Sequence, residues 1–144
     1  LDVPYSYIEH ISDVCIRAEG RTLEEAFEAG AEAMLNCMFG LETIEEKTSV
    51  EITAEAGEVD LLFVEVLNEL LSIQGRDGLA LKRLEAEAIP LKGKNLCFKG
   101  TAFGEKFDPE KHAVKTEVKA ATYSGLRYSR GEKDNHILEC VLDV

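Results

Sequence analysis

The chain has 144 residues, 45% of them hydrophobic and 31% charged, and its 28 acidic and 16 basic residues give a net charge of −12. This length and apolar content predict one domain over residues 1–144 with its own core, and they argue against a disordered chain. The acidity argues against a domain that binds RNA or DNA alone, because phosphate contacts need a basic face. It suits a basic protein partner or a divalent cation instead.

The first elements in chain order are two short strands and a helix. Residues 5–8 are extended, and residues 14–19 alternate apolar and polar side chains as a half-buried strand does. Thr22 and Glu25 have the spacing of a capping box at a helix start. Apolar residues then recur at three- and four-residue steps, and Gly40 is the expected stop of this helix.

A third strand and a second helix follow. Residues 50–55 alternate as a strand, and the helix is expected to begin near Glu58 and Asp60, where acidic side chains suit a helix N-terminus. Gly75 and Gly78 are expected to end it. Apolar residues cover most of the circumference of this helix, which predicts that it is the central and most buried one.

The rest of the chain is expected to be a run of antiparallel strands over residues 79–89, 96–103, 114–128 and 137–144. The alternation slips near Lys82 and Arg83, which predicts a bulge. Asp108 and Pro109 are expected to start a single helical turn. This order of elements predicts an α+β fold, in which two main helices pack on one face of a mixed or antiparallel sheet.

Signatures of catalysis and of membrane insertion are missing from the sequence. It has no phosphate-binding glycine loop, no dinucleotide fingerprint and no nucleophile elbow, and none of its three histidines begins an H-E-x-x-H. No apolar run reaches membrane length and no charged-then-apolar leader is visible, so a cytoplasmic protein is expected. No C-x-x-C occurs, so the four cysteines are expected to be small buried hydrophobes.

Two acidic positions near the chain ends are candidates for a ligand site. Asp13 lies just before a strand, where an aspartate commonly accepts backbone amides in a turn. Asp143 stands beside the α-carboxylate of Val144, and two carboxylates this close repel each other unless something neutralises them. A hard divalent cation would do so through oxygen ligands, although a solvated chain end is the simpler interpretation.

Charged residues alternate along the segment from Lys115 to Tyr123. One interpretation is a half-exposed strand with weak cross-strand ion pairs. The other is a polar face that docks a partner, and on that interpretation Glu117, Lys119 and the histidine at position 10, His10, are candidate partner-binding residues.

These stretches together resemble the archease family. The resemblance runs in order from about Tyr5 to Val144 and is carried by YIEH (7–10), SDV (12–14), TLEEAF (22–27), LNELL (67–71), FDPEKH (107–112), VKTEVKA (114–120) and Asp143.

The resemblance implies an accessory protein rather than a catalyst. Archeases assist the RtcB-type RNA ligase, which joins exons in tRNA splicing with GTP, and they promote guanylylation of the ligase and permit multiple turnover. Family members bind a divalent cation, here expected to be Ca²⁺ or Mg²⁺, and the matching positions are Asp13, Asp143 and the carboxylate of Val144. The family fold is likened to that of a redox-regulated chaperone domain.

Two departures from the family pattern are visible, and two other functions remain open. Ile11-Ser12 replaces the common Thr-Ala, and Ser124 stands where many members have a histidine. One alternative is a general chaperone for RNA- or DNA-modifying enzymes. The other is a small metal-dependent hydrolase, for which His10 is the only general base near Asp13.

Overall fold

Eight strands and two long helices make up the part of the chain that this computed structural model describes, residues 3–9 and 13–144. They follow in the order β1 (Tyr5–Glu9), β2 (Asp13–Gly20), α1 (Leu23–Met38), the 3₁₀ turn η1 (Leu41–Thr43), β3 (Thr48–Ala56), α2 (Val59–Asp77), β4 (Leu79–Ala88), β5 (Leu91–Lys92), β6 (Asn95–Lys106), β7 (Ala120–Arg130) and β8 (His136–Asp143). All described strand pairs are antiparallel, and the predicted α+β class is confirmed.

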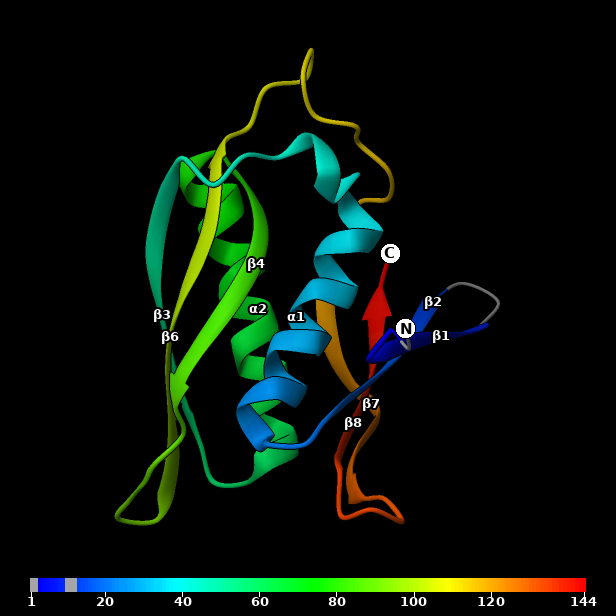
Figure 1. Cartoon of the computed structure of the whole chain (residues 1–144), viewed down its shortest axis with the longest axis vertical. Helices are drawn as coiled ribbons and strands as arrows, with labels where there is room; N and C mark the ends of the chain where they lie inside the picture. Colours follow the sequence, from blue (N-terminus) through cyan, green and yellow to red (C-terminus); the bar gives the residue numbers. More distant parts are fainter. Residues whose placement is uncertain (1–2, 10–12) are drawn as a thin grey trace.

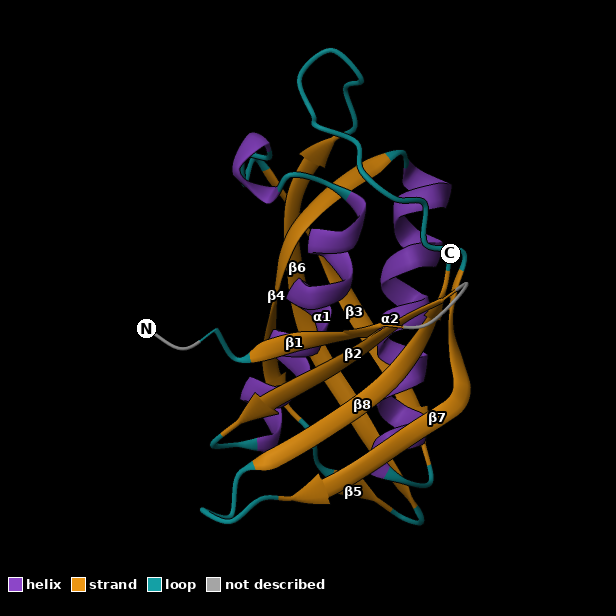
Figure 2. Cartoon of the chain, turned by 90° about the vertical axis from the view of Figure 1, so that its right-hand side faces the viewer, coloured by secondary structure: helices purple, strands orange, loops and turns teal. Residues whose placement is uncertain are grey.

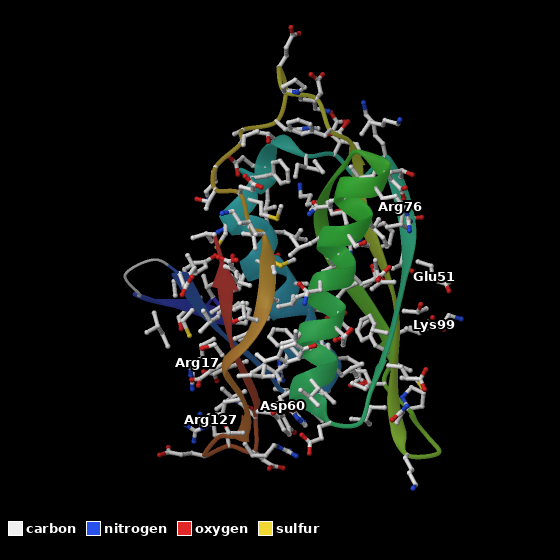
Figure 3. All side chains as sticks on the ribbon, turned by 180° about the vertical axis from the view of Figure 1, so that it is seen from behind. Arg17, Glu51, Asp60, Arg76, Lys99 and Arg127 are labelled. Carbon is white, nitrogen blue, oxygen red and sulfur yellow. The ribbon has the colours of Figure 1, made fainter. Side chains whose placement is uncertain are left out.

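The strands divide into two sheets with both helices between them (Figure 1). One sheet has the order β1-β2-β8-β7, and the other has the order β3-β6-β4 with the short β5 beside β6. Figure 3 shows Arg17 and Arg127 pointing outward from the first sheet, and Glu51 and Lys99 pointing outward from the second. Each sheet therefore presents charged side chains on its outer face.

The expectation of one sheet with helices on one face changes to this three-layer arrangement. Both helices contact strands of both sheets. The physical reason is the apolar circumference of α2, on which eight residues are buried: Leu62, Phe63, Val64, Val66, Leu67, Leu70, Ile73 and Gln74. One sheet can cover only one side of such a helix, so a second sheet covers the other.

One cluster of buried side chains connects the two sheets through the helices. Phe27 of α1 packs edge-to-face on Phe63 of α2 and stacks on Phe98 of β6, with ring centroids 5.4 and 5.6 Å apart. Gly30 allows this packing, since a Cβ there would lie 2.3 Å from the Phe63 ring. The same cluster includes Ile16 from β2 in the other sheet, so both sheets share one core.

The helix ends follow the sequence only in part. Thr22 caps α1 as predicted, with its Oγ1 accepting the Glu25 N–H at 3.1 Å. Gly78 ends α2 in the left-handed conformation at φ 64°, whereas Gly75 lies inside the helix instead of ending it. Gly40 is extended, with φ −70°, because α1 ends through contacts with a distant segment rather than through a left-handed glycine.

Strand β7 is shorter than predicted at its start. Alternation begins at Val114, but the strand starts at Ala120, and Val114 only forms an isolated bridge with Phe39. The main-chain donors of residues 115 and 116 bond to the end of α1 rather than to a neighbouring strand. The bulge predicted near Lys82 and Arg83 is confirmed by a register shift between Leu81 and Arg83.

Candidate functional site

The pairing of β2 with β8 places the two predicted aspartates opposite each other. Asp13 is the register partner of Asp143 in this antiparallel pair, and residues that face each other in this way have Cβ atoms about 4.5–5.5 Å apart on the same side of the sheet. Figure 2 looks onto the outer face of this sheet and shows that β2 begins and β8 ends at the same end of the sheet. Two carboxylates that lie 130 positions apart in the sequence are thus cross-strand neighbours.

The two aspartates lie on the face of the sheet that points away from the helices. Ile16 and Cys140, at alternate positions, belong to the buried core, so Asp13 and Asp143 point the other way. Asp143 is exposed and Asp13 is half-buried. None of the ion pairs found among the described residues neutralises either carboxylate.

The third predicted ligand, the α-carboxylate of Val144, directly follows Asp143. The Val144 residue is half-buried and packs against the core cluster, which fixes its place at the end of β8. Within residues 3–9 and 13–144, no group of three or more His, Cys, Asp or Glu side chains is arranged to hold a metal ion. Asp13 and Asp143 thus lie together without a third such side chain among the described residues.

A segment without helix or strand borders this pair. Residues 107–119, here called the arm, leave β6, pass the end of α1 and reach β7 (Figure 1, yellow to gold). At the far end of the arm, the Lys119 N–H donates to the Asp143 carbonyl at 2.7 Å. The predicted partner-binding residues Glu117 and Lys119 are both exposed there, so the structure brings them to the same edge as Asp143.

The near end of the arm is held by a buried carboxylate at the end of β6. Glu105 is only 6% exposed and accepts hydrogen bonds from the Glu45 N–H at 2.7 Å, the His112 Nε2 at 3.0 Å and the Lys111 Nζ at 2.9 Å. The Glu45 N–H, His112 and Lys111 together lower the pKa of Glu105 to about 2. Glu105 is therefore a permanent anion at neutral pH.

His112 connects this carboxylate to the arm. Its side chain is fully buried, its Nδ1 accepts the Asp108 N–H at 2.9 Å, and its ring stacks on Phe107 with centroids 5.8 Å apart. The Asp108 carbonyl accepts the His112 N–H at 2.8 Å, which closes a turn between the two residues. Since Nδ1 is an acceptor, the proton of the neutral ring lies on Nε2 and points to Glu105.

The middle of the arm caps the C-terminus of α1. The Lys115 and Thr116 N–H groups donate to the carbonyls of Met38 and Cys37 at 2.8 and 3.0 Å. The Lys115 Nζ reaches the Asn36 carbonyl at 2.5 Å. These contacts satisfy carbonyls that a helix end leaves free, and they place a cation at the negative end of the helix dipole.

Asn68 of α2 fixes the point where the arm enters β7. Its side-chain amide pairs with the main chain of Ala121, accepting the N–H at 2.8 Å and donating to the carbonyl at 3.0 Å. Ala121 lies two positions beyond Lys119, so the amide holds the start of β7 against the helix layer.

An apolar groove of about 670 Å³ runs beside the arm, between the ends of α1 and α2. Phe39, Leu71, Phe107, Val114, Glu117 and Lys119 are among the residues that line it. Phe107 and Val114 are 39% and 61% exposed, so the groove is open to solvent along the arm.

The predicted site residues now have the following places. Asp13, Asp143 and Val144 come together at one end of the first sheet, and Glu117 and Lys119 lie beside them on the arm. His10 lies outside the described residues. The contacts of Glu105 and His112 were missed, because only the sequence match of residues 107–112 drew attention to that region.

The other histidine and the cysteines have structural places. His136 stacks on Tyr128, and its Nδ1 lies 2.7 Å from the Tyr128 hydroxyl. All four cysteines are free, and burial raises the pKa of the Cys140 thiol to about 12. Neither helix in the described part of the chain combines the length and the apolar character needed to cross a membrane.

Comparison with known proteins decides the family. Residues 5–144 match the archease protein family (MTH1598/TM1083). The chain belongs to the archease family. It is 36% identical over 140 residues to a protein archease of Pyrococcus furiosus, covering 97% of this chain and 98% of that protein.

Other archeases and a solved structure agree with this assignment. A protein archease of Ictalurus punctatus is 35% identical over 129 residues, covering 90% of this chain and 79% of that protein. The solution structure of Methanobacterium thermoautotrophicum protein 1598 covers 99% of this chain and 100% of its own, with a TM-score of 0.85 and 26% identity. The archease family predicted from the motifs is confirmed, and the α+β fold described above matches that of the solved structure.

Proposed function

We propose that this archease is a non-catalytic accessory protein that activates an RtcB-type, GTP-dependent RNA ligase in tRNA splicing in the cytoplasm. In this role it promotes guanylylation of the ligase and its repeated turnover. Membership of the archease family supports the role, since the resemblance that identified the family carries this activity with it. The net charge of −12 favours encounter with a ligase whose RNA-binding surface is basic.

The observation that carries the proposal is the pairing of Asp13 with Asp143. Like charges directly opposite each other destabilise a sheet, yet the described residues place no Lys or Arg in an ion pair with either one. Two hard carboxylate oxygens fit Ca²⁺ or Mg²⁺, with the Val144 carboxylate as a further ligand. When bound, such a cation would neutralise the pair and could stabilise phosphoryl-transfer charge.

The protein residues around the pair suit a docking surface. The Asp143 main chain is fixed by β2 on one side and by the Lys119 N–H on the other. Glu117 and Lys119 then offer one charge of each sign beside the aspartates. Complementary charges at such a rim orient a partner and speed its association. The cation is either shared with the nucleotide site of the ligase, or it only fixes the conformation of the surface that docks on the ligase.

The test is Asp13→Ala in a multiple-turnover ligation assay with the RtcB-type ligase of the same organism. We expect the variant to fold, to bind Ca²⁺ at least about tenfold more weakly in calorimetry, and to leave the ligase at a single turnover. Glu51→Ala, which removes an exposed carboxylate from the outer face of the other sheet, is the matched control and should behave as wild type (Figure 3).

Normal ligase turnover with Asp13→Ala would contradict the proposal. A general chaperone role predicts a different pattern, in which the protein reduces ligase aggregation without any dependence on GTP or on the cation. Light scattering of the ligase with and without this protein separates the two functions.

A further inference from the structure

We propose that Glu105 and His112 are positioning residues for ligase activation: they hold the near end of the arm so that its far end keeps Glu117 and Lys119 beside Asp143. This role rests on the proposed function, because the arm is taken as part of the surface that docks the ligase. It assigns a task to two residues that lie outside the aspartate pair itself.

The arm cannot place itself. It has 13 residues without helix or strand, a length at which loops are usually functional or disordered. Only two of its side chains are buried, His112 at 3% and Val118 at 5% exposure. With so little apolar surface to bury, the arm depends on polar contacts for its conformation.

The contact between Glu105 and His112 is such a polar contact, and it fixes the orientation of the His112 ring. Each ring nitrogen of His112 has one partner, Asp108 on Nδ1 and Glu105 on Nε2. Glu105 also binds Lys111 of the arm and the main-chain N–H of Glu45, which lies outside the arm. A buried polar network in which every group is satisfied strongly disfavours alternative arrangements, because any change leaves a buried donor or a buried charge unpaired.

The position set at His112 passes along the arm through short main-chain contacts. Ala113, directly after His112, bonds through both of its main-chain groups. Its carbonyl accepts the Gly40 N–H at 2.8 Å, and the Ala113 N–H donates to Thr43 Oγ1 at 3.1 Å. Lys115 and Thr116 then bond to the end of α1, and Lys119 bonds to Asp143. No interval between these anchors is longer than three residues, so little slack remains between the two ends.

The pair lies beside the smaller of two apolar clusters. The His112 ring stacks on Phe107, and Phe107 packs on Phe39, which belongs to this smaller cluster and not to the one that joins the two sheets. Removal of their contact should therefore loosen the arm while the sheets, and with them Asp13 and Asp143, stay in place.

Two substitutions of His112 test this role, since each keeps one of its two contacts. His112→Gln retains a donor within reach of Glu105, whereas His112→Asn retains an acceptor for the Asp108 N–H and loses Glu105. We expect the Asn variant to need about tenfold more protein for half-maximal stimulation of ligation, with the maximal rate unchanged, and the Gln variant to stay within about threefold. His136→Asn is the control, because His136 also stacks on an aromatic ring but lies at the other end of β8.

Amide hydrogen exchange and calcium titration give readouts that a general loss of stability would not reproduce. In His112→Asn, the amides of Lys115, Thr116 and Lys119 should exchange at least about tenfold faster, while those of α2 keep wild-type rates. Calcium affinity should also be unchanged, since both aspartates are held by the sheet. Should the Asn variant fail to fold, the exposed Lys115→Met, which removes one arm contact with α1, is expected to give the same shift in half-maximal concentration.

The outcomes distinguish this role from the proposed function. Equal half-maximal concentrations for wild type and His112→Asn, or equal losses in the Asn and Gln variants, would overturn the positioning role and leave the Asp13 result standing. Loss of stimulation in His112→Asn together with normal turnover in Asp13→Ala would instead refute the cation site and retain the arm.

Discussion

Glu105 shows how a single residue links pH to the stability of this fold. Its pKa falls from 4.5 to about 2 on folding, so the charged form favours the folded state. The contribution of ionised Glu105 to the free energy of unfolding is complete above the pKa of the unfolded state, and it is lost as the pH falls from about 5 through 2. We therefore expect Glu105→Gln to be less stable than wild type at pH 7 and the difference to disappear near pH 2.

Urea unfolding at several pH values measures this effect. The free energies of unfolding of wild type and Glu105→Gln should converge as pH falls, because the glutamine cannot gain or lose a proton. A difference that stays constant from pH 7 to pH 2 would show that the pKa of Glu105 does not shift on folding, and equal free energies of unfolding at pH 7 would show that its contacts contribute nothing to folding. The same residue would then be a poor candidate for holding the arm.

At the scale of elements, the contact between α1 and α2 depends on a glycine. A Cβ at position 30 would lie 2.3 Å from two atoms of the Phe63 ring, and Phe63 is fully buried. We expect Gly30→Ala to destabilise the fold by about 1–3 kcal/mol, since overpacking outweighs the higher helix propensity of alanine. Gly75→Ala is the matched control, because nothing lies within 4 Å of a Cβ there, and it should stabilise by about 0.5–1 kcal/mol. Urea denaturation decides between the signs.

The extent to which the sequence predicts these elements depends on where their hydrogen bonds go. The strand bulge at Leu81 and Arg83 was predictable because a slip in alternation is local. The start of β7 was not, because Lys115 and Thr116 keep the alternating pattern while their N–H groups serve the end of α1. The second sheet could not be predicted for a similar reason. The apolar circumference of α2 shows that the helix is buried, but it does not show which elements cover the helix.

The candidate site was predictable to a different degree. Asp13 and Asp143 were selected from the residues and from the family resemblance, and the antiparallel register brings them together. Spacing along the chain alone could not have shown this. Glu105 belongs to no motif, and the FDPEKH match (107–112) includes His112 but gives it no partner, so only the folded chain reveals their contact.

For the whole molecule, one core cluster serves both sheets, and this predicts cooperative unfolding. Leu67 of α2 is fully buried within that cluster. Leu67→Ala should cost about 2–5 kcal/mol, and both sheets should still unfold together. All four tyrosines lie on β1 or β7, so their fluorescence reports one sheet, while far-UV circular dichroism is dominated by the helices. Transitions that do not coincide by these two probes would show that the layers unfold separately.

The pairing of β2 with β8 has a consequence for the order in which the chain folds. Its register joins residues that lie 116 (Gly20 and His136) to 130 (Asp13 and Asp143) positions apart in the sequence. The entropy of closing so long a loop opposes this pairing before any contact is gained, whereas the hairpins β1–β2 and β7–β8 close much shorter loops. We therefore expect the two hairpins to form early and the contact between Asp13 and Asp143 to form late, when the helices already hold both hairpins together.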